Sequence, residues 1–266
     1  MSTNGKPRVA FFDFACCEGC QLEVLALEER LLDVLQWVDV VQWREAMSEH
    51  ADDYDVAIVE GSITRAEDIP RLQKIRQTAK VVIALGSCAT LGGINAIKNR
   101  FPLDAAMAEV YGEKAEYFNT AEARPIHAVV PVDYFIHGCP INKEEFLTVI
   151  QHALMGKPYT VPNRAVCYEC KLNETVCLYE KGKVCLGPIT RCGCGAICTR
   201  FGQACFGCRG VVEQPNLHAA KEVLTQYGYT VEDVLKRAGL YNSYVAQQEL
   251  AQVGNERSAV PSREGR

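Results

Sequence analysis

The first part of the chain alternates between short apolar runs and amphipathic stretches, from residue 7 to about residue 156. The apolar runs have the length of buried strands, and they span residues 9–14, 37–43, 55–60, 80–85 and 132–137. The amphipathic stretches place apolar residues at helical spacing, and they span residues 22–35, 65–78 and 142–155. Strands that alternate with helices in this way predict an α/β fold with a doubly wound parallel sheet.

The pattern changes after residue 157. Residues 158–215 show no helical or strand periodicity over a useful length and carry cysteine, glycine and proline throughout. We do not expect such a stretch to build an apolar core of its own, so bound metal should hold it together. Helical spacing returns at residues 219–227, 231–238 and 244–253. The chain is therefore predicted to form one domain over 1–157, a second over 158–253, and a polar, disordered tail over 254–266.

Composition excludes several classes of protein. The 266 residues carry a formal net charge of −5, which gives no electrostatic reason to expect a nucleic acid or an anionic membrane as a partner. No run of about 18 apolar residues is present, so no direct membrane span is expected. The N-terminus has neither a long apolar stretch with a small-residue cleavage site nor paired arginines, and we therefore predict a cytoplasmic protein.

Cysteine is the unusual component of the chain. There are 14 cysteines, and nine of them fall between Cys167 and Cys208. Because thiols stay reduced in the cytoplasm, clustered cysteines there favour metal ligation over a disulfide framework.

Five cysteines follow predicted strands of the first domain. Cys16, Cys17 and Cys20 come directly after the first strand, Cys88 follows the fourth, and Cys139 follows the fifth. Loops at the carboxyl ends of parallel strands meet at one edge of a sheet, so these thiols should converge. Four of them, Cys17, Cys20, Cys88 and Cys139, are the number that a cubane iron–sulfur cluster or a tetrahedral zinc requires.

Two other interpretations of these five cysteines are weaker. Buried free cysteines pack as small hydrophobic residues, but cysteine at three separate strand ends makes that interpretation less favourable. A phosphate-binding loop is disfavoured because residues 86–93 lack the Lys-Ser/Thr ending of such loops.

The second-half cysteines divide into two further groups of four by their spacing, with Cys192 left over. One group is Cys167, Cys170, Cys177 and Cys185, and the other is Cys194, Cys198, Cys205 and Cys208. Zinc ribbons also use CxxC pairs, so spacing alone does not fix the metal. Three four-cysteine sites with no catalytic histidine or carboxylate cluster between them favour an electron relay over three structural zinc ions.

The motifs resemble one known family, the small subunits of [NiFe] hydrogenases, over nearly the whole chain up to about residue 210. The likeness is greatest to the cytosolic type, the delta subunit of NAD(P)-linked hydrogenases (sulfhydrogenases). In the first half it rests on CCEGCQLE (16–23), VEGSIT (59–64), GSCATLGG (86–93) and HGCPI (137–141). In the second half it rests on CYEC (167–170), CLGPIT (185–190), CGAIC (194–198) and CFGCRG (205–210).

This resemblance implies a fold and a set of ligands. The fold would be a flavodoxin-like sheet followed by a small irregular iron–sulfur domain and C-terminal helices. Three [4Fe–4S] clusters are implied, and their ligands would form three quartets. The proximal quartet is Cys17, Cys20, Cys88 and Cys139; the medial quartet is Cys194, Cys198, Cys205 and Cys208; the distal quartet is Cys167, Cys170, Cys177 and Cys185.

The resemblance also implies a function and partners. The chain would be an electron-transfer subunit whose proximal cluster faces a nickel–iron site in a large subunit. Diaphorase-type partners carrying flavin would reduce NAD(P). No catalytic residue is expected in this chain, since hydrogen cleavage belongs to the large subunit.

Alternatives remain open at this point. The acceptor could instead be that of a deazaflavin-reducing or heterodisulfide-reductase-linked hydrogenase. The quinone-reductase subunit of complex I shares the proximal fold but would not need the nine-cysteine second half. A zinc-stabilised scaffold protein is the alternative from a different class.

Several residues near the predicted clusters have no assigned role. Cys16 and Cys192 match no ligand position. Glu18 and Glu60 could assist proton movement or tune a cluster, although solvated or interface carboxylates are the simpler interpretation. His137 could donate a hydrogen bond to a cluster sulfur or be an ordinary strand-end residue. Arg191 and Arg209 could offset the negative charge of the thiolates and clusters, although ordinary polar residues of a loop domain are the simpler interpretation. Tyr168 could border the exit surface, although aromatic packing is the simpler interpretation.

Overall fold

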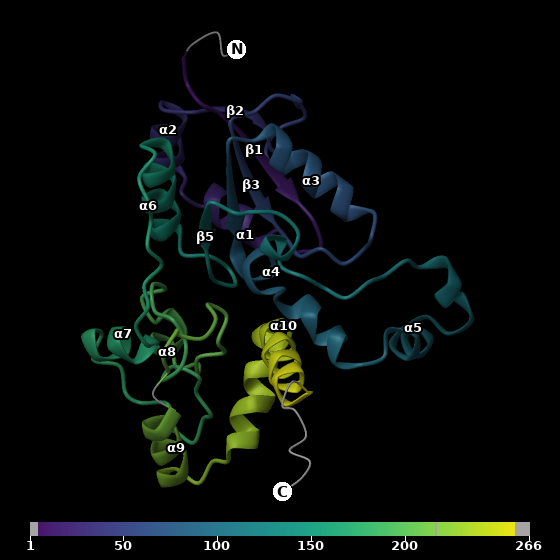
Figure 1. The fold of residues 1–266 in the computed structure, drawn as a ribbon. Helices are drawn as coiled ribbons and strands as arrows, with labels where there is room; N and C mark the ends of the chain where they lie inside the picture. The colour runs from purple at the N-terminus through teal and green to yellow at the C-terminus, as the bar shows by residue number, and fades with distance from the viewer. Residues whose placement is uncertain (1–4, 216, 259–266) are drawn as a thin grey trace, which may run out of the picture.

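A five-stranded parallel sheet forms the first half of the chain. The computed structural model describes residues 5–215 and 217–258. The strands are β1 (Arg8–Asp13), β2 (Asp39–Gln42), β3 (Val56–Glu60), β4 (Val81–Leu85) and β5 (Tyr134–Ile136), in the order β2-β1-β3-β4-β5 (Figure 1). This order is the flavodoxin-like arrangement, so the predicted doubly wound parallel sheet and its five strands are confirmed.

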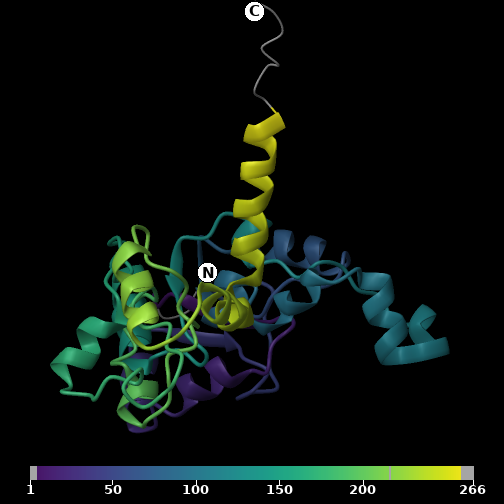
Figure 2. The same ribbon diagram turned by 90° about the horizontal axis from the view of Figure 1, so that it is seen from below.

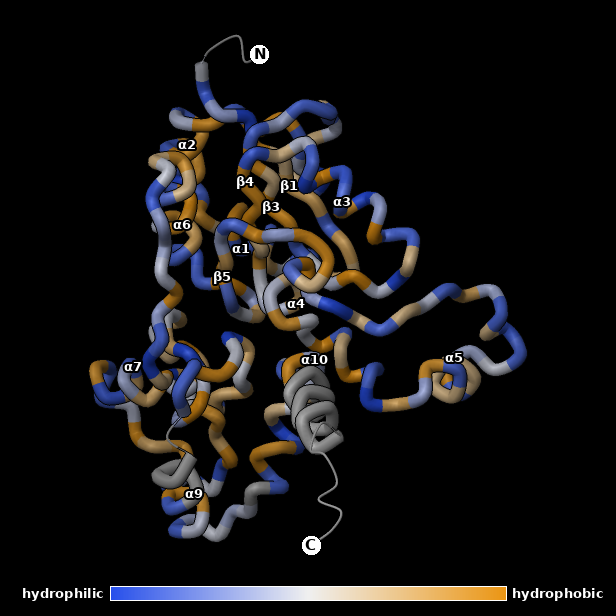
Figure 3. The backbone as a smooth tube through the Cα atoms, viewed as in Figure 1, coloured by the Kyte–Doolittle hydropathy of each residue, from blue (hydrophilic) through white to orange (hydrophobic). Residues whose placement is uncertain are grey.

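Alternate residues of the strands build two separate apolar layers, because successive side chains of a strand point to opposite faces. Phe11 and Ile58 belong to the layer under α1 (Gly19–Leu25), α2 (Glu29–Leu35) and α6 (Lys143–Leu154). Phe12 and Val59 belong to the layer on the other face, which is shared with α3 (Asp68–Thr78). The central strands are accordingly orange in Figure 3, as expected for strands buried on both faces.

The predicted helix over residues 22–35 is wrong, because the structure divides it into α1 and α2. Leu27 and Glu28 make i→i−3 backbone hydrogen bonds to Val24 and Leu25, which tighten the chain and end the α-helical turn. Leu27 thereby enters the core, and Glu28 adopts a backbone φ of 53° and ψ of −122°. Spacing alone could not show this break, since the apolar positions keep a helical period across it.

Replacing Glu28 with glycine is expected to stabilise the chain by about 1 kcal/mol. A side chain at positive φ is strained, whereas glycine adopts that conformation freely. Thermal unfolding of the two chains would measure the difference. The neighbouring change Glu29→Gly, inside α2, serves as the control and should destabilise; a lower unfolding temperature for Glu28→Gly would contradict the prediction.

The segment between β4 and β5 contains five short helices that the pattern did not predict. They are α4 (Gly86–Leu91), η1 (Ile94–Arg100), α5 (Leu103–Tyr111), η2 (Gly112–Tyr117) and η3 (Ile126–Ala128). In Figures 1 and 2 the α5–η2 part extends away from the sheet as an arm. The stacked rings of Tyr111 and Phe118, 3.9 Å apart, close its end. This arm has few buried residues, so it lacks the periodicity from which a sequence predicts helices.

The second half is more regular than predicted. It contains α7 (Val166–Leu172), α8 (Ile197–Arg200), α9 (Leu217–Gln226) and α10 (Val231–Ser258). Residues 158–215 contribute Val166, Leu178 and Leu186 to an apolar cluster, but this cluster also contains Leu224 of α9, so the stretch shares its core with the C-terminal helices. Cys185 and Cys205 belong to the same cluster, so the sulfur atoms and the core are built together.

Helix α10 joins the two halves of the chain. It covers the predicted helices 231–238 and 244–253, with a kink at Asn242, and packs against η1 and α4 of the first half. Its far end projects from the body in Figure 2. The predicted disordered tail is therefore wrong at residues 254–258, which are helical, and its residues 259–266 lie outside the described part. Within the described residues, no helix is long and apolar enough to cross a membrane.

Candidate metal centres

The proximal quartet comes together at the carboxyl edge of the sheet. Cys17 and Cys20 lie at the start of α1, Cys88 lies in α4, and Cys139 follows β5. The N–H of Ser87 donates a hydrogen bond of 2.7 Å to the carbonyl of Gly138, which fixes α4 beside the loop after β5. Three loops from distant parts of the sequence thus present thiols to one place, as the strand-end rule predicts.

Burial and mutual proximity control the acidity of these thiols. Burial raises the pKa of Cys88 to about 12, and the nearby Cys139, Glu60 and Cys17 add to the rise. Burial likewise raises the pKa of Cys20, again with contributions from Glu60 and Cys139. These raised pKa values keep the free thiols protonated, so the thiolate form that ligates metal would need a cation among the four sulfur atoms.

Two glycines leave the space that the proximal thiols occupy. Gly86 has a φ of 82°, and a Cβ placed there would collide with the Sγ of Cys20. A Cβ at Gly93, with a φ of 55°, would lie 2.9 Å from the Sγ of Cys88. Both positions therefore require glycine for backbone conformation and for space.

Glu60 serves the fold of this edge. Its carboxylate is buried at the end of β3 and accepts backbone hydrogen bonds from Cys20 (3.1 Å) and Gln21 (3.2 Å). These N–H groups belong to the first turn of α1, where backbone donors lack helical partners and a negative charge is favoured. Burial nevertheless raises the pKa of Glu60. Glu60 thus holds Cys20 in position through the backbone.

The medial quartet lines a single cavity of about 60 Å³. All four of its members face this cavity, and they are Cys194, Cys198, Cys205 and Cys208. Cys139 of the proximal quartet and Tyr241 of α10 line it as well. Burial raises the pKa of Cys208 to about 12 and that of Cys194 to about 11.

The distal quartet lines a second cavity, of about 250 Å³, and all four members face it: Cys167, Cys170, Cys177 and Cys185. A Cβ at Gly187 would lie 3.4 Å from the Sγ of Cys167 and 3.5 Å from that of Cys185, so this glycine leaves room between two of the thiols. Cys177 is exposed, whereas Cys185 is buried in the apolar cluster of the second half.

Direct contacts place the three quartets in a row. Cys139 links the proximal quartet to the medial cavity, and Thr199 lines both the medial and the distal cavities. The hydroxyl of Thr199 lies 3.0 Å from the Sγ of Cys170. The N–H of Cys205 donates to the Sγ of Cys185 at 3.2 Å. The spatial order is therefore proximal, medial, distal, although the distal cysteines precede the medial ones in the sequence.

Glu169 connects the two second-half quartets from within the CYEC motif. Its carboxylate accepts hydrogen bonds from the N–H groups of Gly193 (2.8 Å) and Ala196 (3.1 Å), and the Sγ of Cys194 lies 3.8 Å away. Ala196 adopts a positive φ of 51°, a conformation that the bond to Glu169 helps to hold. A distal-motif residue thus fixes the backbone that carries a medial ligand position.

A buried ion pair ties the medial quartet to the first half. Arg209 is only 1% exposed and donates two hydrogen bonds to the Glu145 carboxylate of α6, at 2.6 and 2.8 Å. It also donates to the carbonyls of His137 (2.6 Å) and Cys192 (2.8 Å). The interpretation of Arg209 as an ordinary loop residue is wrong, because one guanidinium joins α6, the end of β5 and the medial loop.

Three other residues near the predicted clusters, His137, Cys192 and Cys16, make fewer contacts that bear on the quartets. His137 is buried and hydrogen-bonded to the Thr90 hydroxyl at 2.9 Å, and burial, together with nearby Arg209 and Arg191, lowers its pKa to about 3. Cys192 is buried and lies beyond the described linings of both cavities. Cys16 lies near Cys88 and Glu60. Burial raises the pKa of the Cys16 thiol to about 12, and the negative charge of Glu60 adds to the rise.

Three other residues weighed from the sequence lie nearer the surface. Glu18 contacts Arg44 at 3.6 Å. Arg191 lies 4.0 Å from Glu213. Tyr168 is 46% exposed and packs beneath the guanidinium of Arg164.

Sequence reasoning missed three residues that contact the quartets. Glu169 could have been noticed, because a carboxylate between two thiol ligands needs another partner. Thr199 and Tyr241 could not, since nothing in their spacing connects them with cysteines elsewhere in the chain. Thr199 directly follows Cys198, and the packing of α8 brings it to the distal thiols as well, whereas only the packing of α10 brings Tyr241 to the medial cavity.

The donor chemistry fits iron–sulfur clusters at all three places. Each group consists of four thiols, the ligand set of a [4Fe–4S] cluster, and glycines leave the space beside them. Across residues 5–215 and 217–258, no three His, Cys, Asp or Glu side chains gather closely enough to hold a single metal ion. The thiols instead surround two cavities and one shared edge.

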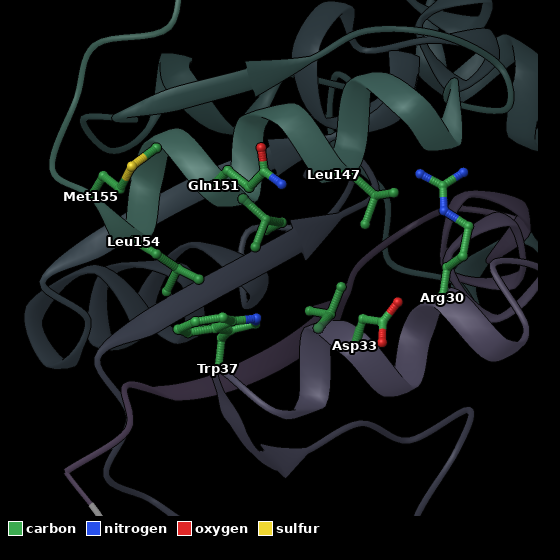
Figure 4. A pocket seen from close by; sticks show the side chains of 9 residues that line it. Arg30, Asp33, Trp37, Leu147, Gln151, Leu154 and Met155 are labelled. Atoms are coloured by element: carbon green, nitrogen blue, oxygen red, sulfur yellow. The ribbon is translucent and has the colours of Figure 1, made fainter.

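A separate surface groove lies between α2 and α6 (Figure 4). It has a volume of about 560 Å³, and Trp37, 71% exposed, faces Leu154 and Met155 across it. None of its lining residues is a cysteine, so it has no part in the metal centres.

Comparison with known proteins places the proximal edge in one family. The family described as NADH ubiquinone oxidoreductase, 20 kDa subunit, matches residues 17–153. This segment contains the whole proximal quartet. The NAD⁺-reducing [NiFe]-hydrogenase, solved in its H₂-reduced state, contains a similar chain with a TM-score of 0.51 and 27% identity, and the match covers 58% of this chain and 95% of that one.

Two curated relatives extend the likeness into the second half. The delta subunit of sulfhydrogenase 2 from Pyrococcus furiosus is 34% identical over 221 residues, covering 82% of this chain and 92% of that protein. A vhu subunit of the F420-non-reducing hydrogenase from Methanococcus voltae is 30% identical, covering 92% of this chain and 97% of that protein. Matches of this extent necessarily reach beyond residue 157 and include cysteine-rich sequence.

Proposed function

The chain belongs to the family of the NADH ubiquinone oxidoreductase 20 kDa subunit and, within it, is a small subunit of a [NiFe]-type hydrogenase; from that membership we propose that it conducts electrons through three [4Fe–4S] clusters. The proximal, medial and distal quartets would supply the ligands. The observation that supports this proposal most strongly is the row of contacts that joins the three quartets through Cys139, Thr199 and Cys205. When bound, each cluster supplies a carrier for one electron.

We assign a partner to each end of the row from the position of its quartet, and the reverse reaction would use the same row in the opposite direction. Cleavage of one H₂ in the large subunit gives two protons and two electrons, and the electrons pass singly. The proximal quartet lies at the sheet edge, and we assign it to the side of the large subunit. Cys177 of the distal quartet is exposed, as are Cys17 and Cys198 of the other two quartets; because the distal quartet stands at the other end of the row, we assign it to the exit.

We assign an NAD(P)-reducing diaphorase as the partner at the exit. NAD(P)⁺ takes up two electrons and one proton to become NAD(P)H, so two successive transfers through this chain would serve one turnover. The likeness to the NAD⁺-reducing [NiFe]-hydrogenase and to the sulfhydrogenase delta subunit supports this assignment.

A second acceptor is supported by a different likeness. The F420-non-reducing hydrogenase subunit matches a larger share of this chain than the NAD⁺-reducing one does. The name of that relative says only that it does not reduce F420, and we keep a heterodisulfide-reductase-linked acceptor, which the sequence motifs left open, as the second candidate. In both cases the role of this chain's cysteines is the same.

Iron analysis of the complete hydrogenase complex, purified without oxygen, tests the proposal. The small subunit is expected to hold about twelve irons, as three [4Fe–4S] clusters require, and its brown absorbance should bleach when H₂ is added. A colourless small subunit holding about three zinc ions instead would overturn the proposal. Supplying NAD⁺, NADP⁺ or a heterodisulfide in turn, each with H₂, identifies the acceptor.

A further inference from the structure

A polar hollow, which we call the distal hollow, lies on the surface beside the cavity of the distal quartet. It has a volume of about 330 Å³, and its walls come from the loop after α7 and from α8 (Figure 1). The side-chain amide of Asn173 donates to the carbonyl of Gly195 at 2.9 Å and holds these two segments together. Val176 and Thr199 line the distal hollow and the distal cavity alike. Anything that fills the distal hollow therefore lies next to the distal thiols.

Positive charge surrounds the distal hollow. Four exposed cations lie around it or in the adjoining lining of the distal cavity, and they are Lys171, Lys181, Lys183 and Arg200. The ammonium of Lys183 reaches the wall by donating to the carbonyl of Gly202 at 2.7 Å. Two exposed carboxylates, those of Glu174 and Glu180, share these linings. This end of the row is therefore basic, although the whole chain has a formal net charge of −5.

Exposed apolar side chains accompany these cations. Phe201 directly follows Arg200 and is 78% exposed, and Leu172 directly follows Lys171 and is 67% exposed. Val176, in the wall of the hollow, is also exposed. Single exposed apolar residues are common on protein surfaces, but apolar side chains beside arginine and a rim of charge are typical of protein–protein interfaces. The surface around the distal hollow has this composition.

The chemistry of the distal hollow distinguishes among its possible occupants. A second copy of this chain would place lysines and arginine against the same cations, and like charges brought together at an interface are unfavourable. A small anion would neutralise Lys181 and Arg200 but would leave Phe201 and Leu172 in water. A protein surface that carries carboxylates and apolar side chains satisfies both the charges and the apolar groups.

We infer that the surface around the distal hollow is the docking site for the protein that exchanges electrons with the distal centre, and that this partner presents an acidic surface there. The inference rests on the proposed function, because it takes the distal quartet as the exit. Docking at this surface brings the partner against Val176 and Thr199, which line the distal cavity. Complementary charge would speed the encounter and select this partner over others.

The double substitution Lys181→Glu/Arg200→Glu tests the inference in the complete hydrogenase complex. The readout is a ratio of two rates in dilute solution. The first is H₂-driven reduction of NAD⁺, NADP⁺ or a heterodisulfide, and the second is isotope exchange between H₂ and D₂O, which needs no electron to leave the complex. The ratio should fall about tenfold. Size-exclusion chromatography should show that the acceptor partner separates from the small and large subunits.

Three further variants separate charge from structure. Lys181→Arg/Arg200→Lys keeps both charges and should keep the natural ratio. Phe201→Ala changes no charge and should lower the ratio about tenfold, as expected for an aromatic side chain in an interface. Lys74→Glu/Lys157→Glu is the matched control, because both lysines are exposed, in α3 and after α6, and its ratio should be natural.

Several results would overturn the docking inference. They are a ratio within twofold of the natural one in Lys181→Glu/Arg200→Glu or in Phe201→Ala, and an equal fall in the Lys74→Glu/Lys157→Glu control. Retention of the acceptor partner with a raised KM for the nucleotide would show a small-anion site instead, and loss of a second copy of this chain would show self-association. These results leave the proposed function intact, whereas a natural complex whose small subunit holds no iron would overturn the proposed function itself.

Discussion

Replacing Cys88 with alanine is expected to remove about four irons from the chain and to abolish H₂-driven reduction of the acceptor. Cys88 is surrounded by Cys139, Glu60 and Cys17, so its loss leaves three thiols at an edge built for four. The medial and distal quartets line their own cavities and should keep their iron. The remaining clusters would then be cut off from the large subunit.

Iron analysis and an activity assay with H₂ and NAD⁺, NADP⁺ or a heterodisulfide measure this result. Cys192→Ala is the matched control, because Cys192 is buried in the same chain and carries no predicted ligand role. It should retain full iron and activity. Natural iron content and activity in Cys88→Ala would show that the proximal assignment is wrong.

A glycine variant separates the ligand from the space around it. Gly86→Ala changes no thiol, but its Cβ would collide with the Sγ of Cys20 at a φ of 82°. It should lose the same irons as Cys88→Ala. Gly112→Ala shares the backbone cost, with a φ of 54°, but meets nothing within 4 Å, so it should keep its iron. If Gly86→Ala kept as much iron as Gly112→Ala, the space beside Cys20 would not be critical.

The sequence was sufficient to predict features that depend on local pattern and on one topological rule. The strand at Val81–Leu85 is a continuous apolar run, and such runs indicate strands buried on both faces. The meeting of Cys20 with Cys139 follows from strand order, because parallel strands end at one edge. Neither prediction needed knowledge of a distant side chain.

Features that depend on long-range packing could not be predicted. Helix α1 ends early because Leu27 turns into the core, and the apolar period is the same with or without that turn. Tyr241 lines the medial cavity because α10 bends at Asn242 and is bonded to Gly207. Each of these depends on a contact between parts of the chain that no short pattern connects.

The core of the second half is another feature that sequence spacing could not predict. Its apolar residues, such as Val166 and Leu186, have no regular spacing, yet they bury together with Cys185 and Cys205. Free cysteine behaves as a small hydrophobic residue when it is packed. Treating these cysteines only as metal ligands therefore missed their second role, because Cys185 and Cys205 are also part of the apolar core.

Replacing Arg209 with methionine is expected to lower the unfolding temperature of the chain by about 10 °C. The change leaves the Glu145 carboxylate buried without its cation, and breaking a buried pair on one side costs about 3–5 kcal/mol. Each kcal/mol shifts the unfolding temperature of a domain of this size by roughly 2–4 °C. Arg209 also bonds the carbonyls of His137 and Cys192, so the medial quartet should release its iron early on heating.

A double variant separates the charge from the shape of the site. With Glu145→Met added, no uncompensated charge remains, and replacing both members of a buried pair with apolar groups is often nearly neutral. Arg209→Met/Glu145→Met should therefore regain most of the lost unfolding temperature. Arg30→Met is the surface control, because Arg30 pairs with the neighbouring Glu144 of α6 in solvent, where ion pairs contribute little.

Thermal unfolding of the complete complex, followed by absorbance of the clusters and by circular dichroism, distinguishes the outcomes. If the pair joins the halves, cluster absorbance and helical structure should be lost together, at a lower temperature in Arg209→Met than in Arg30→Met. An unfolding temperature of Arg209→Met equal to that of Arg30→Met would show that the pair does not hold α6 to the medial loop. Continued instability of the double variant would instead assign the main effect to the bonds from Arg209 to the carbonyls of His137 and Cys192. Both variants lack these two bonds, whereas only the single variant leaves the Glu145 charge without a partner.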